Sequence, residues 1–325
     1  MIRMRNLDSS DLGSWMSGMR RPFHAQYYAM YSSIYEGIVT DPLLMMVPVD
    51  DHMVHRGDAV FETLKCVDGN IYNMHAHLAR LASSARGLSL NLPCIEKELA
   101  EIVIQTTFTG GRPDCLIRLL LSRGPGSLGA NPYDCPASAL YVVVSEYKEP
   151  FMDLHPGGAK AKASGLPVKS APFANLKSVN YLANVLMKKE AVDADVDFVV
   201  SFDENGHLAE GPTENAGIVT RAGHLCVPKP ERILAGTTML RVMELARELP
   251  NNQQLAGVET SDIAQADIVA AAEVLIFGTT PDVTAVIEFD GKPVGDGKPG
   301  PIFRMLSRLL ADDIHLNASM QTRVF

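Results

Sequence analysis

A lysine just ahead of a predicted helix is the first residue of this sequence whose position could serve chemistry. Lys177 lies in the stretch NLKSVNYLANVLMKKEA, residues 175–191. One buried helical face is predicted from the spacing of five apolar residues: Val179, Leu182, Ala183, Leu186 and Met187. An amine shielded from water attacks carbonyl groups, because burial or a cationic neighbour lowers its pKa. The residues alone also allow the other interpretation, a solvated lysine beside a helix start.

A carboxylate at a strand end is the second candidate. Glu210 lies in HLAEGPTENAGIV, residues 207–219, where it ends an apolar run and precedes a Gly-Pro turn. A buried carboxylate at such a place would hold a heterocyclic ring nitrogen protonated, and a solvated one would be an ordinary loop acid. The local sequence does not decide between the two.

Two turns of the same composition could bind an anion. LAGTTMLRV (234–242) and LIFGTTPDV (275–283) each contain a glycine followed by two threonines. The first turn, with Thr237 and Thr238, is predicted to open a helix, whose free N–H groups attract phosphate; the alternative is that a threonine simply caps that helix. Two such turns, together with Arg80 inside an otherwise apolar helix face, favour a phosphate site.

The composition excludes several classes of protein. The net charge of −9 argues against a broad nucleic-acid-binding face, and no apolar run is long enough for a transmembrane helix. The five cysteines are scattered and never form C-x-x-C, which indicates free thiols in a reducing compartment. We expect no bound metal, because no Cys, His or carboxylate set has metal-ligand spacing. The patterns G-x-x-x-x-G-K-[ST] and G-x-S-x-G are also absent.

The elements that must position these residues alternate irregularly along the chain. A hairpin is predicted around Asp68-Gly69, and the Pro- and Gly-rich stretch 148–167 is the best candidate for a linker. Helices are predicted over 75–90, 95–111, about 236–248 and 301–314, with a meander of short strands over 197–228. The pattern indicates a mixed α/β protein of two domains, without regular βαβ units. We expect an extension over 1–27, an N-terminal domain over 28–155 and a C-terminal domain over 156–325.

Six sequence blocks, in this order, resemble the class IV aminotransferases, which are fold-type IV pyridoxal-phosphate enzymes. The family includes branched-chain and D-amino acid aminotransferases and 4-amino-4-deoxychorismate lyase. The blocks are HRGDAVFETLKCVDGNIY, HLARLASSARGL, LKSVNYLANVLMKKEA, LAEGPTENAGIV, LAGTTMLRVMELA and EVLIFGTTPDVTAVIEFDGKPVGDGKPGP. The stretch AMYSSIYEGIVTDPLLMMVPVDDHMVHRGDAVFET is similar to plant-type D-amino acid transaminase and aminodeoxychorismate lyase homologues.

The resemblance assigns roles to individual residues. It implies that Lys177 forms a Schiff base with pyridoxal phosphate and that Glu210 pairs with the pyridinium nitrogen. It further implies that Arg80 binds the phosphate together with the turn threonines Thr237, Thr238 and Thr279, and that Tyr181 hydrogen-bonds the phenolic oxygen of the cofactor. A smaller N-terminal α/β domain, a larger C-terminal one and a homodimer with its sites between domains are also implied.

The substrate is less well specified. Arg56, Arg118 and Thr280 are candidates for binding the substrate, and either arginine could equally be an ordinary structural residue. The family implies an amino acid donor, branched-chain or D-configured, and a 2-oxo acid acceptor. The alternative is the lyase that releases pyruvate and 4-aminobenzoate. Some lyases of the family have a threonine at the position of Glu62, and the glutamate here favours transamination.

The N-terminal extension bears on the location of the protein. The first 25 residues contain four arginines, together with Asp8 and Asp11, and have no apolar core of a secretory signal. We expect a cytoplasmic protein, with targeting to an organelle as the open alternative.

Overall fold

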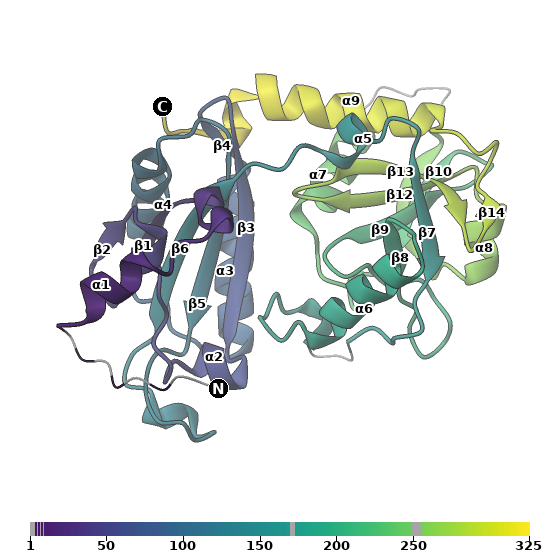
Figure 1. The fold of residues 1–325 in the computed structure, drawn as a ribbon. Helices are drawn as coiled ribbons and strands as arrows, with labels where there is room; N and C mark the ends of the chain where they lie inside the picture. Colours follow the sequence, from purple (N-terminus) through teal and green to yellow (C-terminus); the bar gives the residue numbers. More distant parts are fainter. Residues whose placement is uncertain (1–3, 5, 7, 9, 170–172, 249–254) are drawn as a thin grey trace.

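Seven strands form the antiparallel sheet of the first domain (Figure 1). The computed structural model describes residues 4, 6, 8, 10–169, 173–248 and 255–325. Across the sheet the order is β15-β4-β3-β5-β6-β1-β2. The strands are β1 (Tyr27–Ser32), β2 (Gly37–Val39), β3 (Ala59–Val67), β4 (Asn70–Tyr72), β5 (Cys115–Ser122), β6 (Ala139–Glu146) and β15 (Gln321–Arg323).

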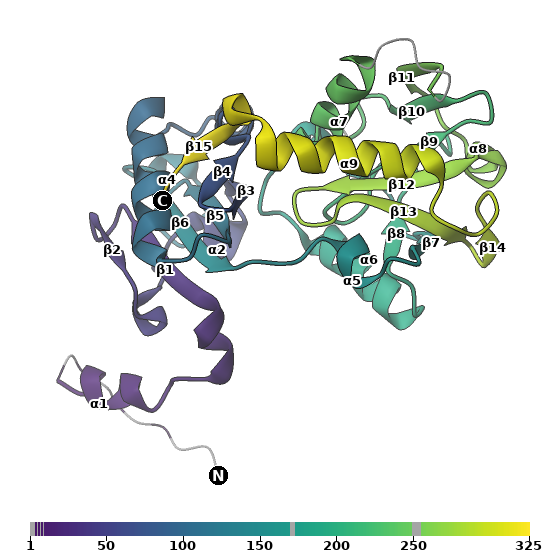
Figure 2. The same ribbon diagram turned by 90° about the horizontal axis from the view of Figure 1, so that it is seen from above.

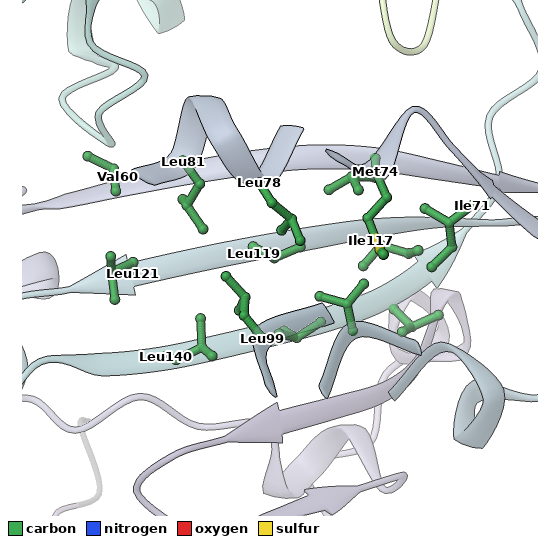
Figure 3. Close-up of a cluster of buried hydrophobic side chains, with 14 of the residues drawn as sticks. Val60, Ile71, Met74, Leu78, Leu81, Leu99, Ile117, Leu119, Leu121 and Leu140 are labelled. Carbon is green, nitrogen blue, oxygen red and sulfur yellow. The ribbon is translucent and has the colours of Figure 1, made fainter. Parts of the chain in front are cut away.

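Two helices cover one face of this sheet, α3 (Met74–Gly87) and α4 (Glu96–Gly110). Successive side chains of a strand point to opposite faces, so Val60 and Leu64 of β3 and Leu119 of β5 all face the helices. Figure 3 shows Val60 and Leu119 packed with Leu78 and Leu81 of α3. Two short helices lie elsewhere in the N-terminal part, α1 (Leu12–Ser17) and α2 (His52–Arg56).

The second domain contains a mixed sheet in the order β11-β10-β9-β12-β13-β7-β8. Its strands are β7 (Ala159–Ala163), β8 (Phe198–Val200), β9 (Asn215–Val219), β10 (His224–Pro228), β11 (Gly257–Ser261), β12 (Glu273–Gly278) and β13 (Asp282–Phe289), and β14 (Lys292–Pro293) pairs with β13. One core contains Leu275 and Phe277, and the other contains Val274 and Ile276, because β12 alternates between the two faces. The helices are α5 (Phe151–Leu154), α6 (Leu182–Asp193), α7 (Thr237–Glu248), α8 (Gln265–Ala270) and α9 (Pro301–Leu316).

Helix α9 and the strand after it tie the two domains together (Figure 2). The helix packs on α7 and β13 of the second domain, and β15 then pairs with β4 of the first. The Tyr72 hydroxyl of β4 donates to the Asp313 carboxylate of α9 at 2.5 Å, and the Lys65 ammonium lies 2.5 Å from the Asp282 carboxylate. The two domains are therefore joined by a sheet edge and by buried polar contacts. Among the described residues, no helix combines the length and the apolar character needed to span a bilayer.

Most predicted elements are present, and three expectations need correction. The predicted helical face before residue 191 is not buried as a whole: α6 begins only at Leu182, which is 75% exposed, and Leu186 is also exposed. Of that face, Met187 is buried as predicted, and it packs with Ala191 against Val199 of β8. Asn184 is also buried, and its amide donates to the Pro212 carbonyl. The chain passes from the first sheet to the second within the predicted linker, but that stretch also forms α5 and β7, and β7 pairs with β13 and β8. The predicted meander is interrupted because β8 lies at the sheet edge, away from β9.

Candidate active site

Lys177 is held by backbone hydrogen bonds to strand β3 of the first domain. Because β4 pairs only with the far end of β3, the edge at residues 59–61 is free for the segment that precedes α6. The Phe61 N–H donates to the Lys177 carbonyl at 2.9 Å, and the Val179 N–H donates to the Ala59 carbonyl at 3.0 Å. The Lys177 N–H donates to the Ser84 hydroxyl of α3 at 3.2 Å. The lysine therefore lies at the junction of the two domains.

The Lys177 amine is in a buried and cationic environment. The residue is 8% exposed, and its Nζ lies 4.6 Å from the centre of the Phe61 ring. Burial lowers the pKa of Lys177 to about 8, and the positive charge of Arg80 adds to the effect. About a tenth of this amine is unprotonated at pH 7, far more than for a solvated lysine, and the unprotonated form is the nucleophile. Lys177 is not a solvated surface lysine.

Glu210, the second candidate residue, lies on a tight turn that leads into β9. Its Oε2 accepts a hydrogen bond from the Leu234 N–H at 2.9 Å, and its carbonyl accepts one from the Ser201 N–H. Burial raises the pKa of Glu210 to about 7, although the charges of Lys169 and Lys177 oppose this. A carboxylate that is poorly solvated and within the field of two lysines is well suited to pair with a protonated ring nitrogen.

Arg80 points from α3 to the start of α7 and is held by a buried carboxylate. Glu62 of β3 is fully buried and accepts from Arg80 Nε at 2.7 Å and from Nη2 at 2.8 Å. Arg80 Nη1 donates to the Ala235 carbonyl at 3.0 Å. Burial alone would raise the pKa of Glu62, but the Arg80 guanidinium outweighs it and holds that pKa at about 2. The guanidinium is thus fixed next to the turn that opens α7.

The turn at 236–238 opens α7, as predicted. A side chain at Gly236 would collide with the Asn215 amide and would have to displace it from its hydrogen bond to the Leu234 carbonyl. Thr237 and Thr238 form the first residues of the helix and are both buried. The first N–H groups of a helix have no intrahelical acceptor, and with Arg80 beside them they form a site for a phosphate.

The second turn joins β12 to β13 and contains Thr279 and Thr280, both partly exposed. Thr280 borders a surface cavity together with Lys148 and Lys188, and no other predicted site residue lines that cavity. The structure thus brings together Arg80, Lys177, Glu210, Thr237 and Thr238, and it leaves Thr280 beside a separate hollow.

Tyr181 and the two candidate arginines differ in their surroundings. Tyr181 is the N-cap residue of α6, and its ring packs edge-on against Phe61 at 5.0 Å. Burial raises the pKa of the Tyr181 hydroxyl, which therefore stays protonated and able to donate. The Arg118 guanidinium lies 5.7 Å from the centre of the same Phe61 ring and is exposed, next to the lysine.

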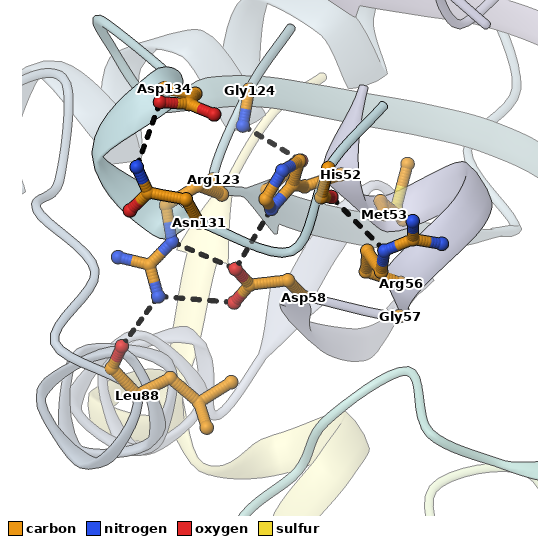
Figure 4. Close-up of polar contacts among 12 residues, drawn as sticks. His52, Met53, Arg56, Gly57, Asp58, Leu88, Arg123, Gly124, Asn131 and Asp134 are labelled. Carbon is orange, nitrogen blue, oxygen red and sulfur yellow. Dashed lines mark hydrogen bonds and ion pairs between the residues drawn. The ribbon is translucent and has the colours of Figure 1, made fainter. Parts of the chain in front are cut away.

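Arg56 anchors a loop. Its guanidinium donates to the carbonyls of His55, Leu128 and Gly129 and so fixes the loop that follows β5. Figure 4 shows the neighbouring network, in which Arg123 pairs with Asp58. These contacts give Arg56 a structural role in the described chain.

Three residues near the lysine were not predicted as site residues. Glu62 occupies a core-facing position of β3 between Val60 and Leu64, and a charge at such a position is a signal that strand alternation could have given. His77 lies three residues, about one helical turn, before Arg80, and its Nδ1 is 2.8 Å from the Glu62 carboxylate, which accepts the hydrogen bond. Lys169 lies 4.5 Å from the centre of the Tyr181 ring, and no sequence pattern marks it.

Comparison with known proteins places the chain in a family. The family model described as amino-transferase class IV matches residues 59–289. The Arabidopsis thaliana protein named D-amino-acid transaminase, chloroplastic, is 37% identical over 290 residues, which cover 89% of this chain and 77% of that protein. A putative branched-chain-amino-acid aminotransferase of Methanocaldococcus jannaschii is 30% identical over 272 residues, covering 82% and 90%.

Solved structures agree with the family. A branched-chain amino acid aminotransferase from T.th., in complex with N-(5'-phosphopyridoxyl)-L-glutamate, has a TM-score of 0.83 and 26% identity, and the match covers 92% of this chain and 99% of that one. This chain belongs to the class IV aminotransferase family. The predictions of a mixed α/β, two-domain fold and of a pyridoxal-phosphate-dependent aminotransferase are confirmed.

Proposed function

We propose that Lys177 is the lysine that binds pyridoxal phosphate covalently. The observation that carries the proposal is the placement of its buried amine among Arg80, Glu210 and the start of α7. The donor set fits the cofactor: a cation and free helix N–H groups for the phosphate, a carboxylate for the ring nitrogen and an amine with a lowered pKa for the aldehyde. Once bound, the cofactor withdraws electrons from the substrate Cα.

The residues around the lysine have distinct tasks in this proposal. Lys177 would accept and return the proton at the substrate Cα, and its pKa of about 8 suits a base near neutral pH. Glu210 holds a proton on the ring nitrogen. Arg80 would bind the phosphate, with hydroxyls and backbone N–H groups contributed by Thr237, Thr238 and Thr279. Tyr181 would donate to the phenolic oxygen of the cofactor.

The substrate pair is an amino acid and a 2-oxo acid. The relatives are named for branched-chain and D-amino acids, and we propose a donor of one of these two classes. Arg118 supports a carboxylate-bearing substrate. Its exposed guanidinium and the Lys177 amine both lie beside the Phe61 ring, so the guanidinium could bind a substrate carboxylate near the amine. The lyase alternative is not favoured, since these relatives are transaminases and Glu62 is present.

A donor panel tests the function. Purified protein with pyridoxal phosphate is given L- and D-amino acids, one at a time, with a 2-oxo acid acceptor, and the new amino acid is measured. One branched-chain or D-amino acid donor should react at least about 10-fold faster than its mirror image, and Lys177→Ala should abolish the reaction. Release of pyruvate from aminodeoxychorismate without any acceptor would instead establish the lyase.

We also propose that the chain forms a homodimer. Helix α6, directly after the lysine segment, exposes Leu182, Val185, Leu186 and Val192 to solvent. An apolar helix face of this size is usually covered by a partner. A second copy of the chain is the proposed partner.

The proposed compartment is the cytoplasm. Fractionation of cells that express the full chain would test it.

A further inference from the structure

Glu62 is the centre of a buried hydrogen-bond chain that reaches the start of α7. Its carboxylate accepts three hydrogen bonds, two from Arg80 and one from His77 Nδ1. On its other side, His77 Nε2 lies 3.2 Å from the Thr237 hydroxyl. Three elements, β3, α3 and α7, are therefore connected by one line of polar atoms, Glu62–His77–Thr237.

The Glu62 carboxylate determines which atoms donate and which accept along the Glu62–His77–Thr237 hydrogen bonds. An ionised carboxylate only accepts hydrogen bonds, so His77 Nδ1 must carry a proton. Burial lowers the pKa of His77, and the neutral ring then has a lone pair on Nε2. That nitrogen can only accept, so the Thr237 hydroxyl must be its donor.

Thr238, the next residue, differs from Thr237 in its hydrogen bonding. Among the described residues, the Thr238 hydroxyl has no hydrogen-bond partner, although the residue is only 8% exposed. Arg80 uses three of its N–H groups on Glu62 and Ala235, which leaves two of its five free. The groups able to donate to a phosphate at this turn are thus the remaining Arg80 N–H groups, the backbone N–H groups and Thr238.

We propose that Glu62 and His77 are positioning residues of the phosphate site, which direct the Thr237 hydroxyl proton away from the phosphate and leave Thr238 as the hydroxyl that donates to it. The proposal rests on the proposed function, because it takes the start of α7 as the phosphate site. It separates two neighbouring threonines that the sequence does not distinguish.

The charged groups around His77 come from every element packed against it. Glu62 faces it from β3, Arg80 lies on its own helix α3, and Lys177 acts from the segment before α6. From α7 it meets only the Thr237 hydroxyl. A proton added to Nε2 would reverse the last hydrogen bond and release the Thr237 hydroxyl toward the phosphate.

The test compares two ligands that differ by the phosphate. Dissociation constants of pyridoxal phosphate and of pyridoxal are measured on the full chain after removal of cofactor, and their ratio reports the phosphate contacts alone. We expect Thr238→Val to reduce this ratio by about 10-fold or more, as loss of a hydrogen bond to a charged group does, and Thr237→Val to reduce it by less than about 3-fold. A loss of stability would weaken both ligands and leave the ratio unchanged.

A double-mutant cycle tests the part played by His77. The amide nitrogen of His77→Asn can take the place of Nδ1 and keep the bond to Glu62, but it has no atom at Nε2. In this background the Thr237 hydroxyl is free to donate to the phosphate. Thr237→Val should therefore reduce the ratio of the two dissociation constants by about as much as Thr238→Val does.

Three outcomes would overturn the proposal. Equal losses for the two threonine variants in the native background would mean that Thr237 donates to the phosphate directly. An unchanged effect of Thr237→Val in the His77→Asn background would mean that His77 does not direct the hydroxyl. If the native chain binds pyridoxal phosphate no more tightly than pyridoxal, the phosphate site fails, and the proposed function fails with it.

Discussion

Lys177 and Phe61 are in contact twice: the Lys177 carbonyl accepts the Phe61 N–H at 2.9 Å, and the Lys177 amine lies 4.6 Å from the centre of the Phe61 ring. The lysine precedes a helix of the second domain, and the phenylalanine belongs to a strand of the first. The amine is therefore aimed by both domains, and a change in their relative position moves it away from Glu210 and the start of α7.

Replacement of Lys177 should abolish covalent binding of the cofactor. Lys177→Ala removes the amine, and Lys177→Arg replaces it with a group that stays protonated, so both should lower transamination by at least about 10²- to 10⁴-fold. Borohydride reduction followed by peptide mass spectrometry should attach the cofactor to the peptide that contains Lys177. Attachment at the nearby Lys169 in the native protein would contradict the assignment.

Glu210→Gln should slow the reaction without releasing the cofactor. The amide has nearly the same shape but cannot hold a proton on the ring nitrogen, so we expect a loss of about 10²-fold or more in the rate of amino transfer. The affinity for pyridoxal phosphate should change little, because the phosphate contacts remain. Glu214→Gln, four residues later, is the matched control, and equal losses for both variants would remove the special role of Glu210.

The Glu62–Arg80 pair should make stability depend on acid pH. The folded pKa of Glu62 is about 2, below the ordinary value of 4.5, so its contribution is complete above about pH 4.5 and is lost as the pH falls toward 2. The shift corresponds to about 3 kcal/mol. Urea unfolding of the native chain and of Glu62→Gln should differ at pH 7, and the difference should shrink below pH 4. A difference that stays constant with pH would show that the carboxylate charge does not contribute.

The Lys65–Asp282 pair should stabilise the contact between domains. Lys65 is buried and Asp282 is mostly so, and removing one partner leaves a charge in a poorly solvated place. Lys65→Met or Asp282→Asn alone should lower the free energy of unfolding by about 2 to 4 kcal/mol, and the double variant should recover at least half. Denaturant titration measures both, and losses that simply add would mean that the pair does not interact.

A charge on the exposed face of α6 should dissociate the dimer. Val185→Glu places a carboxylate in the apolar face formed by Leu182, Val185, Leu186 and Val192, and burial of an unpaired charge opposes association. Sedimentation should show a dimer for the native chain and a monomer for the variant. Leu316→Glu, an equally exposed site at the end of α9, is the control. A native monomer would contradict the proposed homodimer.

Local patterns predicted most of the elements because the residues that form them are neighbours in sequence. Asp68 and Gly69 both adopt positive φ, as the tight turn between β3 and β4 requires, and the turn at Gly236 opens α7 as expected. The predicted burial of the apolar face of α6 is wrong for a reason that lies outside the local sequence. Apolar spacing shows that a face avoids water, but it does not show whether this chain or another one covers it.

The candidate site was predicted in part. Lys177, Glu210, Arg80 and Thr238 each follow a recognisable local pattern, and the fold brings them together. Glu62 and His77 act through partners on other elements, and the distances that give them their roles arise only when α3 packs on β3. Lys169 contacts the ring of Tyr181, and no periodicity in the sequence predicts that contact.

The pairing of β15 with β4 has a consequence for how the protein is made. On the ribosome, β3, β4 and β5 emerge early, but the outer edge of β4 has no partner until residues 321–323 have been synthesised. An open strand edge readily pairs with other chains, so the nascent first domain is exposed to aggregation throughout synthesis of the second. Deletion of residues 321–325 would leave that edge open permanently, and its first effect would be on the yield of soluble protein rather than on catalysis.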